Sequence, residues 1–289
     1  MKILVSTDSS CLINYELLKK NNVSIFPLNV IIDGEEYLDN VTINQAELLK
    51  AMNENKSIKT STPAMGMVID YFEKLFNEGY DKIIHFTISS KLSSMYSLFE
   101  TVSKNEFDGK IIVVDSYSAT ALMLSHVLYA VDEINKGTSL EEIVKNIELR
   151  KEKNYICFMP KDLTALKNGG RISPAVAAIG NTLGLKPVIS LTDGELVKDT
   201  MATNMKKKFK DLFNSRLDKF PPTDYDYTIV SFDGDEVAVN ALKDYIETNS
   251  AAKVLNGILP INVCAHCGPG TIGLVVSPKI NGKSIKEFE

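Results

Sequence analysis

Two short segments of the sequence place several hydroxyl side chains directly before the start of an expected helix. They are Lys59 to Pro63, which reads KTSTP, and Ser89 to Ser94, which reads SSKLSS. The first turn of a helix carries unpaired backbone N–H groups and partial positive charge, so this position favours a bound anion. If the two helix starts converge in space, they form a pocket for a carboxylate or a phosphate without a lysine, an arginine or a metal.

A third hydroxyl-rich segment, Thr7 to Ser10, follows the first expected strand. Side chains at the carboxyl end of a parallel sheet commonly bind ligands. An Asp-Ser-Ser sequence also forms ordinary capping turns, and both interpretations remain open for this segment. We expect the three hydroxyl-rich segments to lie at the same edge of one sheet.

Two further segments combine a charged or titratable side chain with glycines. Arg171 follows Gly169 and Gly170, and its planar guanidinium suits a bound anion, a partner's carboxylate or an ordinary surface ion pair. His266 begins a glycine-rich loop that runs to Gly273, where the backbone can approach a ligand closely. A ligand contact and a structural hydrogen bond both remain open for this histidine.

The cysteines and the remaining histidines do not indicate a metal site. Cys264 and Cys267 have the CxxC spacing of a redox pair or of half a zinc site. Zinc requires further ligands, and His85 and His126 lie in apolar segments that are typical of a protein core. We therefore expect no metal site.

Length and charge restrict the class of protein. The chain has 289 residues, of which 44% are hydrophobic, and this is enough for two domains with substantial cores. A net charge of -5 argues against a nucleic-acid partner, because nucleic-acid-binding proteins concentrate positive charge on one face. The apolar start, Met1 to Val5, is too short for a signal peptide or a membrane span, so we expect a cytoplasmic protein.

Apolar strands alternate with helical patterns up to about residue 150, which predicts an α/β fold with a mostly parallel sheet flanked by helices. Hairpin signals follow, which predict an α/β domain with a mixed sheet. We expect an N-terminal domain over residues 1–150 and a C-terminal domain over residues 151–289. Strands are expected at 2–6, 24–32, 82–87, 110–115, 155–159, 188–192, 195–198, 227–232, 254–259 and 273–276. Helices are expected at 15–21, 42–53, 63–79, 94–103, 119–136, 140–151, 174–183, 205–213 and 236–249. Thr62 is the expected cap of the helix at 63–79.

The order of these motifs resembles that of the DegV family, bacterial fatty-acid-binding proteins that carry the acyl chain in fatty acid kinase systems. No single motif is specific, but the ordered set is, and it extends from residue 7 to residue 273. The matching segments are Thr7-Asp8-Ser9-Ser10, Thr60-Ser61-Thr62-Pro63, Ser89-Ser90-Lys91-Leu92-Ser93, Asp115-Ser116, Gly169-Gly170-Arg171-Ile172-Ser173, Leu185-Lys186-Pro187 and the loop from His266 to Gly273.

The resemblance implies that a long-chain, palmitate-like fatty acid lies between the two domains, with its carboxylate held by hydroxyls. On the matching positions these hydroxyls would belong to Thr60 or Ser61 and to Ser93, with His266 nearby. The resemblance also implies a kinase subunit that phosphorylates the carboxylate, with Arg171 facing this partner, and transient contact with a membrane surface for lipid exchange. The chemistry would then belong to the kinase, so the resemblance implies no catalytic residue and no cofactor in this chain. The chain also has no P-loop motif for a nucleotide.

The sequence departs from the family pattern in three places. Thr62 stands where many members have Gln, and Ser94-Met95 stands where they have Gly-Thr. Both changes alter the surroundings of the expected carboxylate site. Ala202-Thr203-Asn204 stands where members have Arg-Thr-Arg, so arginines expected at the surface shared with the kinase are missing.

Two other functions remain open from the sequence. A serine-dependent hydrolase or acyl transferase could use Ser93 as nucleophile, His266 as base and Asp8 as the acid that orients the base. Against it, the chain has no G-x-S-x-G motif. The third possibility is an interaction module in which a bound lipid is only structural.

Overall fold

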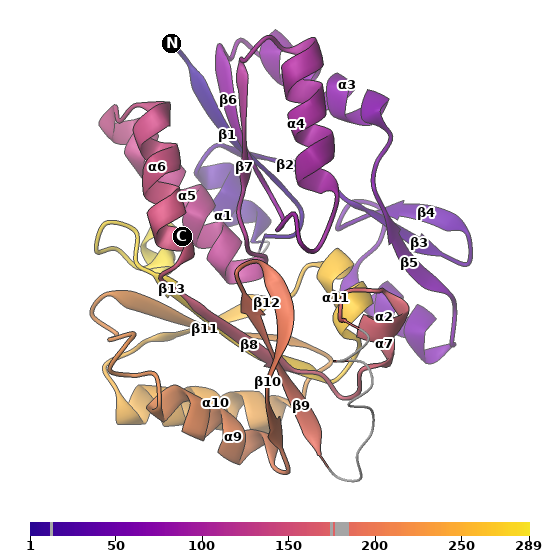
Figure 1. The fold of residues 1–289 in the computed structure, drawn as a ribbon, viewed down its shortest axis with the longest axis vertical. Helices are drawn as coiled ribbons and strands as arrows, with labels where there is room; N and C mark the ends of the chain where they lie inside the picture. Colours follow the sequence, from indigo (N-terminus) through magenta and orange to yellow (C-terminus); the bar gives the residue numbers. More distant parts are fainter. Residues whose placement is uncertain (12–13, 174–175, 177–184) are drawn as a thin grey trace.

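The computed structural model describes residues 1–11, 14–173, 176 and 185–289, which form three β-sheets and the helices around them (Figure 1). The first sheet has four parallel strands in the order β2-β1-β6-β7. Their bounds are β1 (Ile3–Asp8), β2 (Val23–Phe26), β6 (Lys82–Thr87) and β7 (Ile111–Asp115). The predicted parallel sheet is therefore confirmed.

Helices cover both faces of the parallel sheet. On one face, α3 (Met65–Asn77) and α4 (Met95–Glu106) pack around Phe72 and Phe99. On the other face lie α1 (Tyr15–Lys20) and α5 (Thr120–Lys136), and α6 (Leu140–Lys151) packs on α5. Every residue of α5 from its start to Glu133 is buried, because the helix also packs against the second large sheet.

The second large sheet is mixed, with six strands in the order β10-β9-β8-β13-β11-β12. Helices α9 (Met205–Asn214) and α10 (Glu236–Asn249) cover its outer face, and α5 lies against its inner face (Figure 1). The predicted hairpin at Asp193-Gly194 is confirmed between β9 and β10. The strand bounds are β8 (Tyr155–Met159), β9 (Lys186–Thr192), β10 (Glu195–Ala202), β11 (Tyr225–Phe232), β12 (Val254–Ile258) and β13 (Thr271–Pro278).

A third sheet, of three antiparallel strands, is not predicted from the sequence. The strand expected at 24–32 is wrong as one unit, because Pro27 has no N–H group to continue the ladder beyond β2. The chain instead forms β3 (Asn29–Ile32), which pairs with β4 (Glu35–Leu38) and β5 (Ile58–Ser61), while α2 (Gln45–Asn53) connects these last two strands. The hydroxyl-rich segment after Lys59 therefore belongs to this small sheet, and the expectation of one shared sheet edge is wrong.

The other helices among the described residues are short. Two of them, α7 (Thr164–Asn168) and α11 (Ile261–Cys267), are not predicted from the sequence, nor is the 3-10 turn Ile285–Phe288. The helix expected at 174–183 lies outside the described residues. All strands that the structure describes after residue 150 lie in the six-stranded sheet, but α11 packs against β3 and β5. The domain boundary near residue 150 therefore stays a prediction.

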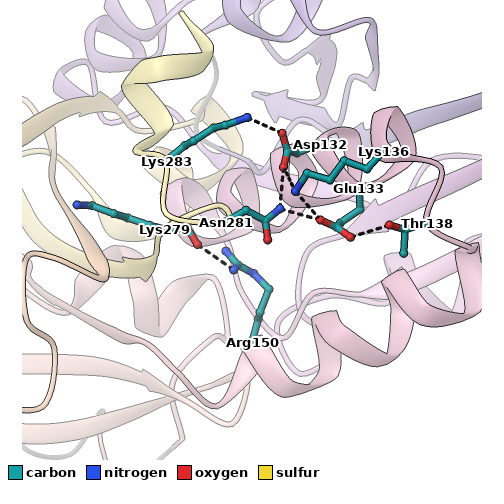
Figure 2. A network of polar contacts seen from close by, with 8 residues as sticks. All are labelled: Asp132, Glu133, Lys136, Thr138, Arg150, Lys279, Asn281 and Lys283. Atoms are coloured by element: carbon teal, nitrogen blue, oxygen red, sulfur yellow. Dashed lines mark hydrogen bonds and ion pairs between the residues drawn. The ribbon is translucent and has the colours of Figure 1, made fainter.

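A polar network fixes the end of β13 to α5 and α6 (Figure 2). The Asp132 carboxylate on α5 pairs with Lys136 at 2.7 Å and with Lys283 at 3.0 Å. The Arg150 guanidinium on α6 donates to the carbonyl oxygen of Lys279 at 3.1 Å. Because α5 also packs on β1, this network holds the two large sheets on opposite sides of one helix.

Two histidines are core residues, as the sequence predicts. His85 and His126 are fully buried, and burial lowers the pKa of His85 to about 3 and the pKa of His126 well below 6.5. The His85 ring stacks on Phe99 with 4.2 Å between centroids, and its Nδ1 lies 2.9 Å from the Ser6 hydroxyl. Both imidazoles are therefore neutral in the folded protein at neutral pH.

The substitution His85→Phe is expected to reduce the acid sensitivity of folding. A histidine with a lowered pKa in the folded state stabilises the protein above pH 6.5, and this contribution is lost as the pH falls toward 3. Between pH 7 and pH 5 the loss is about 2 kcal/mol. The phenyl ring keeps the stack, and the Ser6 hydroxyl keeps Tyr71 as a partner. Urea unfolding at both pH values should show a smaller difference in the variant, and an unchanged difference would contradict the assignment.

Candidate functional site

The two hydroxyl-rich loops expected to converge do so. Thr62 Oγ1 lies 2.7 Å from Ser94 Oγ and joins the loop after β5 to the loop before α4. Thr62 is therefore not the cap of α3, contrary to the prediction, because its hydroxyl is bonded to the other loop. The residue before α3 is Ala64, which makes no side-chain capping bond.

A largely apolar cavity opens beside this contact. Its empty volume, including the solvent space at the mouth, is about 1160 Å³. Its lining comes from the parallel sheet's loops, the small sheet and the inner face of the six-stranded sheet. The apolar lining residues are Leu28, Ile88, Leu92, Met95 and Ala119 from the first half of the chain and Ile156, Phe158, Leu166, Leu191, Leu196, Val230, Leu259, Val263 and Val275 from the second.

Hydroxyl and amide groups line the same cavity, and some of them lack partners. Thr60, Ser61 and Ser93 are part of the lining, together with Asn29. Ser61 Oγ and Asn29 Oδ1 are buried and have no hydrogen-bond partner within the described part of the chain. The two residues are directly paired between β3 and β5, so their side chains share a face. An unsatisfied buried polar group costs about 1–3 kcal/mol, and a ligand or water that bonds to these atoms removes this cost.

His266 stands at the polar part of the cavity. Its Nε2 lies 2.9 Å from Thr60 Oγ1, and its buried Nδ1 has no hydrogen-bond partner among the residues described. Burial, together with the positive charge of Arg171, lowers the pKa of His266 to about 4. The imidazole is therefore neutral at pH 7, with one N–H to donate.

Gly169 allows this histidine to approach the backbone closely. A Cβ atom at position 169 would lie only 2.2 Å from His266 Nδ1. We expect Gly169→Ala to displace the imidazole from Thr60 and to lower the free energy of unfolding by about 1–3 kcal/mol, as in an overpacked core. Gly66→Ala in α3 is the control, because its Cβ meets nothing within 4 Å and alanine favours a helix. Equal unfolding midpoints for the two variants would contradict the contact.

Arg171 lies inside the site as well as at its edge. It lines the cavity and also the groove on the other side of His266. Its Nε donates to the carbonyl oxygen of Leu92 at 3.0 Å, which fixes the guanidinium to the loop that carries Ser93. It forms no ion pair in the described part of the chain, so the interpretation as a surface salt bridge is wrong.

The segment Thr7 to Ser10 has its polar groups bonded within the protein. Asp8 accepts backbone N–H groups from Ser10 at 2.8 Å and from Ile88 at 2.7 Å. The Ser10 hydroxyl accepts from the Asn262 amide at 2.6 Å. None of the four residues belongs to the described lining of the cavity. The structural turn is therefore the better interpretation of this segment.

The described residues provide neither a metal site nor a helix that could span a membrane. No three of their histidine, cysteine, aspartate and glutamate side chains are grouped to hold an ion. Cys264 and Cys267 are both buried on α11, where Gln45 Nε2 lies 3.6 Å from Cys264 Sγ. No helix among the residues described is both long and apolar enough to cross a bilayer.

Fold and cavity together define a two-domain α/β protein with an apolar pocket that ends in hydroxyl, amide and imidazole groups. The model of the DegV family, described as uncharacterised proteins, matches residues 2–279, and the chain belongs to this family. A DegV domain-containing protein of Staphylococcus aureus is 30% identical over an alignment of 295 residues. The alignment covers 96% of this chain and 99% of the relative. A second, from Clostridium acetobutylicum, is 28% identical over 96% of this chain and 99% of its own length.

Solved structures share the whole fold. A fatty-acid-binding DegV family protein from Thermus thermophilus superimposes with a TM-score of 0.88 at 28% identity, over 96% of this chain and 100% of that one. A stearic-acid-binding protein from Eubacterium ventriosum superimposes with a TM-score of 0.85 at 27% identity, over 97% and 99%. DegV of Bacillus subtilis, at 24% identity and a TM-score of 0.86 over 96% and 100%, has the same fold.

Proposed function

We propose that this protein binds one long-chain fatty acid, with the acyl tail in the cavity and the carboxylate at its polar part. The observation that carries the proposal is the apolar cavity that ends in the unpartnered Ser61 Oγ and Asn29 Oδ1 and the Thr60–His266 pair. The fatty-acid ligands of the Thermus and Eubacterium relatives support it.

The tail supplies most of the binding free energy. Burying a methylene group contributes ~0.8 kcal/mol, so a tail of about 14 to 18 carbons contributes on the order of 10 kcal/mol before ordering costs. The head group then needs only a few charge-assisted hydrogen bonds to fix its position.

The neutral His266 side chain can orient the Thr60 hydroxyl toward a bound carboxylate. If Nε2 carries the imidazole proton, it donates to Thr60 Oγ1 and leaves the Thr60 hydroxyl hydrogen free to point at a bound carboxylate. The Ser61 and Ser93 hydroxyls donate from the same lining, and rotation of the Asn29 amide presents its N–H group. The Arg171 guanidinium is bonded to the carbonyl oxygen of Leu92 and also lines the groove beside His266, so we assign it to the partner contact and not to the groups that hold the carboxylate.

Catalysis is not needed for this role, and the hydrolase geometry is incomplete. His266 Nε2 bonds to Thr60 and not to Ser93. The Asp8 carboxylate accepts from the N–H groups of Ser10 and Ile88 and not from His266. A fluorophosphonate probe is expected to leave all serines unlabelled. Labelling of Ser93 that disappears in His266→Ala would instead support the hydrolase.

Mass spectrometry of lipid extracted from the purified protein tests the binding proposal. A fatty acid in near-equimolar amount, or uptake of added palmitate, is the expected result. Exchange of labelled palmitate with acceptor vesicles within hours separates a carrier from a module with a permanent structural lipid. The proposed transient contact with a membrane surface requires this exchange.

A fatty acid kinase subunit is the proposed partner, with Arg171 at the contact. The groove beside His266 shares Thr60, His266 and Arg171 with the cavity and also contains Lys56 and Lys59. The segment 202–204, where family members have two arginines, has a structural role in this chain. Ala202 is buried, and the Asn204 side chain caps α9 by accepting from the N–H of Lys207. Docking through that stretch is therefore not proposed.

The substitution Arg171→Ala is expected to spare palmitate binding and to weaken kinase-dependent phosphorylation by about tenfold, because a charge-assisted contact contributes ~1.5 kcal/mol or more. Binding is measured by displacement of a fluorescent fatty acid, and phosphorylation by ATP consumption with the kinase subunit added. Equal losses of binding and phosphorylation would assign Arg171 to the pocket alone.

A further inference from the structure

Helix α11 carries His266, and the residue before this helix does not cap it. The residue before it is Pro260, which makes no side-chain hydrogen bond to the helix. The N–H groups of Asn262 and Ile261 instead donate to the Asp39 carboxylate, at 3.1 Å to Oδ2 and 3.4 Å to Oδ1. A carboxylate that accepts from the first N–H groups of a helix does the work of an N-cap. Asp39 thus caps a helix that lies more than 200 residues further along the chain.

The Asp39 carboxylate is itself fixed by the first half of the chain. It is fully buried, and it accepts from the Ser9 hydroxyl at 2.9 Å and from the Asn40 amide at 2.7 Å. Ser9 Oγ in turn accepts from the N–H of Leu28, a residue of the cavity lining, at 3.1 Å. The cap and the cavity wall therefore share one hydrogen-bonded network.

We propose that Asp39 is a positioning residue for the polar part of the cavity: by capping α11 it sets His266 against Thr60. Helix α11 has seven residues, which make only about two turns, so a shift of its first turn moves the whole helix. A displaced start therefore displaces the imidazole, which bonds to Thr60 at 2.9 Å. The inference rests on the proposed function, since it concerns how the carboxylate of a fatty acid is held.

Palmitate and hexadecanol, which share a tail but differ in head group, test the role of Asp39 by displacement of a fluorescent fatty acid. Asp39→Ala is expected to lower the affinity for palmitate by about tenfold or more, which corresponds to the loss of one hydrogen bond to a charged group. The affinity for hexadecanol is expected to change by less than about threefold. Asp39→Asn keeps one oxygen acceptor and should lie between wild type and Asp39→Ala. Asp235→Ala is the control, because it removes an aspartate cap of the same kind from α10, which contributes no residue to the described cavity lining, and it should leave palmitate affinity unchanged.

A double-mutant cycle separates positioning from a general loss of stability. In a His266→Ala background, Asp39→Asn should no longer change palmitate affinity, since the group it positions is gone. Equal losses for palmitate and hexadecanol, or an undiminished effect without His266, would overturn the inference. If Asp39→Ala does not fold, Asp39→Asn carries both comparisons. A wild-type protein that binds neither ligand overturns the proposed function instead, and so the two failures are distinguishable.

Discussion

Replacing Thr60 by Val and Ser61 by Ala in one chain is expected to lower the affinity for palmitate by about 100-fold or more. Each hydroxyl that donates to a carboxylate contributes ~1.5–3 kcal/mol, and 1.4 kcal/mol corresponds to a factor of ten. Thr60→Val also removes the partner of His266 Nε2. Displacement of a fluorescent fatty acid measures the loss, and hexadecanol, which carries no charge, should lose less.

Thr101→Val is the matched control for this experiment. Thr101 is exposed on α4, and its hydroxyl donates to the carbonyl oxygen of Ser97 within the same helix. We expect it to leave palmitate affinity unchanged. An affinity of the double variant within about threefold of wild type, a difference of less than 1 kcal/mol, would show that these hydroxyls do not hold the carboxylate.

The second large effect is expected from Val275→Phe, which places a ring in the cavity. Val275 lies on β13, is buried and lines the cavity from the inner face of the six-stranded sheet. If the space beside it is empty, the ring fits without loss of stability. The tail of palmitate then has no room, so binding should fall below detection, while octanoate should lose less because its tail is shorter.

Val276 provides a sensitive control one residue further along the strand. It faces the opposite side of the sheet and packs in the core beneath α9 and α10. Val276→Phe overpacks that core and is expected to destabilise the protein by about 1–3 kcal/mol. Similar destabilisation by Val275→Phe and Val276→Phe in urea unfolding would contradict an empty cavity on the inner face.

The large elements could be predicted because their signals are local. Buried parallel strands read as continuous apolar runs, such as 111–114 (IIVV) in β7, and α5 ends where its pattern stops, at Gly137. The small sheet gave no such signal, since its strands have four residues each and β4 is half exposed. Its pairing of β3 with β5 closes across 25 residues of intervening chain, and no local pattern specifies such a partner.

The polar residues of the site were predictable only where they occur in clusters. Hydroxyls concentrated around Ser61 and Ser93 indicate an anion site, and the structure brings their loops together through Thr62 and Ser94. Asn29 is a single amide in an apolar strand, and Asp39 is a single acid after a strand. Their roles depend on contacts with residues distant in the chain, so the sequence alone gave no reason to select them.

A crystal structure of the protein with palmitate tests the central claim most directly. The proposed function predicts acyl density along the apolar lining and carboxylate oxygens within hydrogen-bonding distance of the Thr60 and Ser61 hydroxyls. A cavity closed by its own side chains, or palmitate bound only at the outer surface, would contradict it.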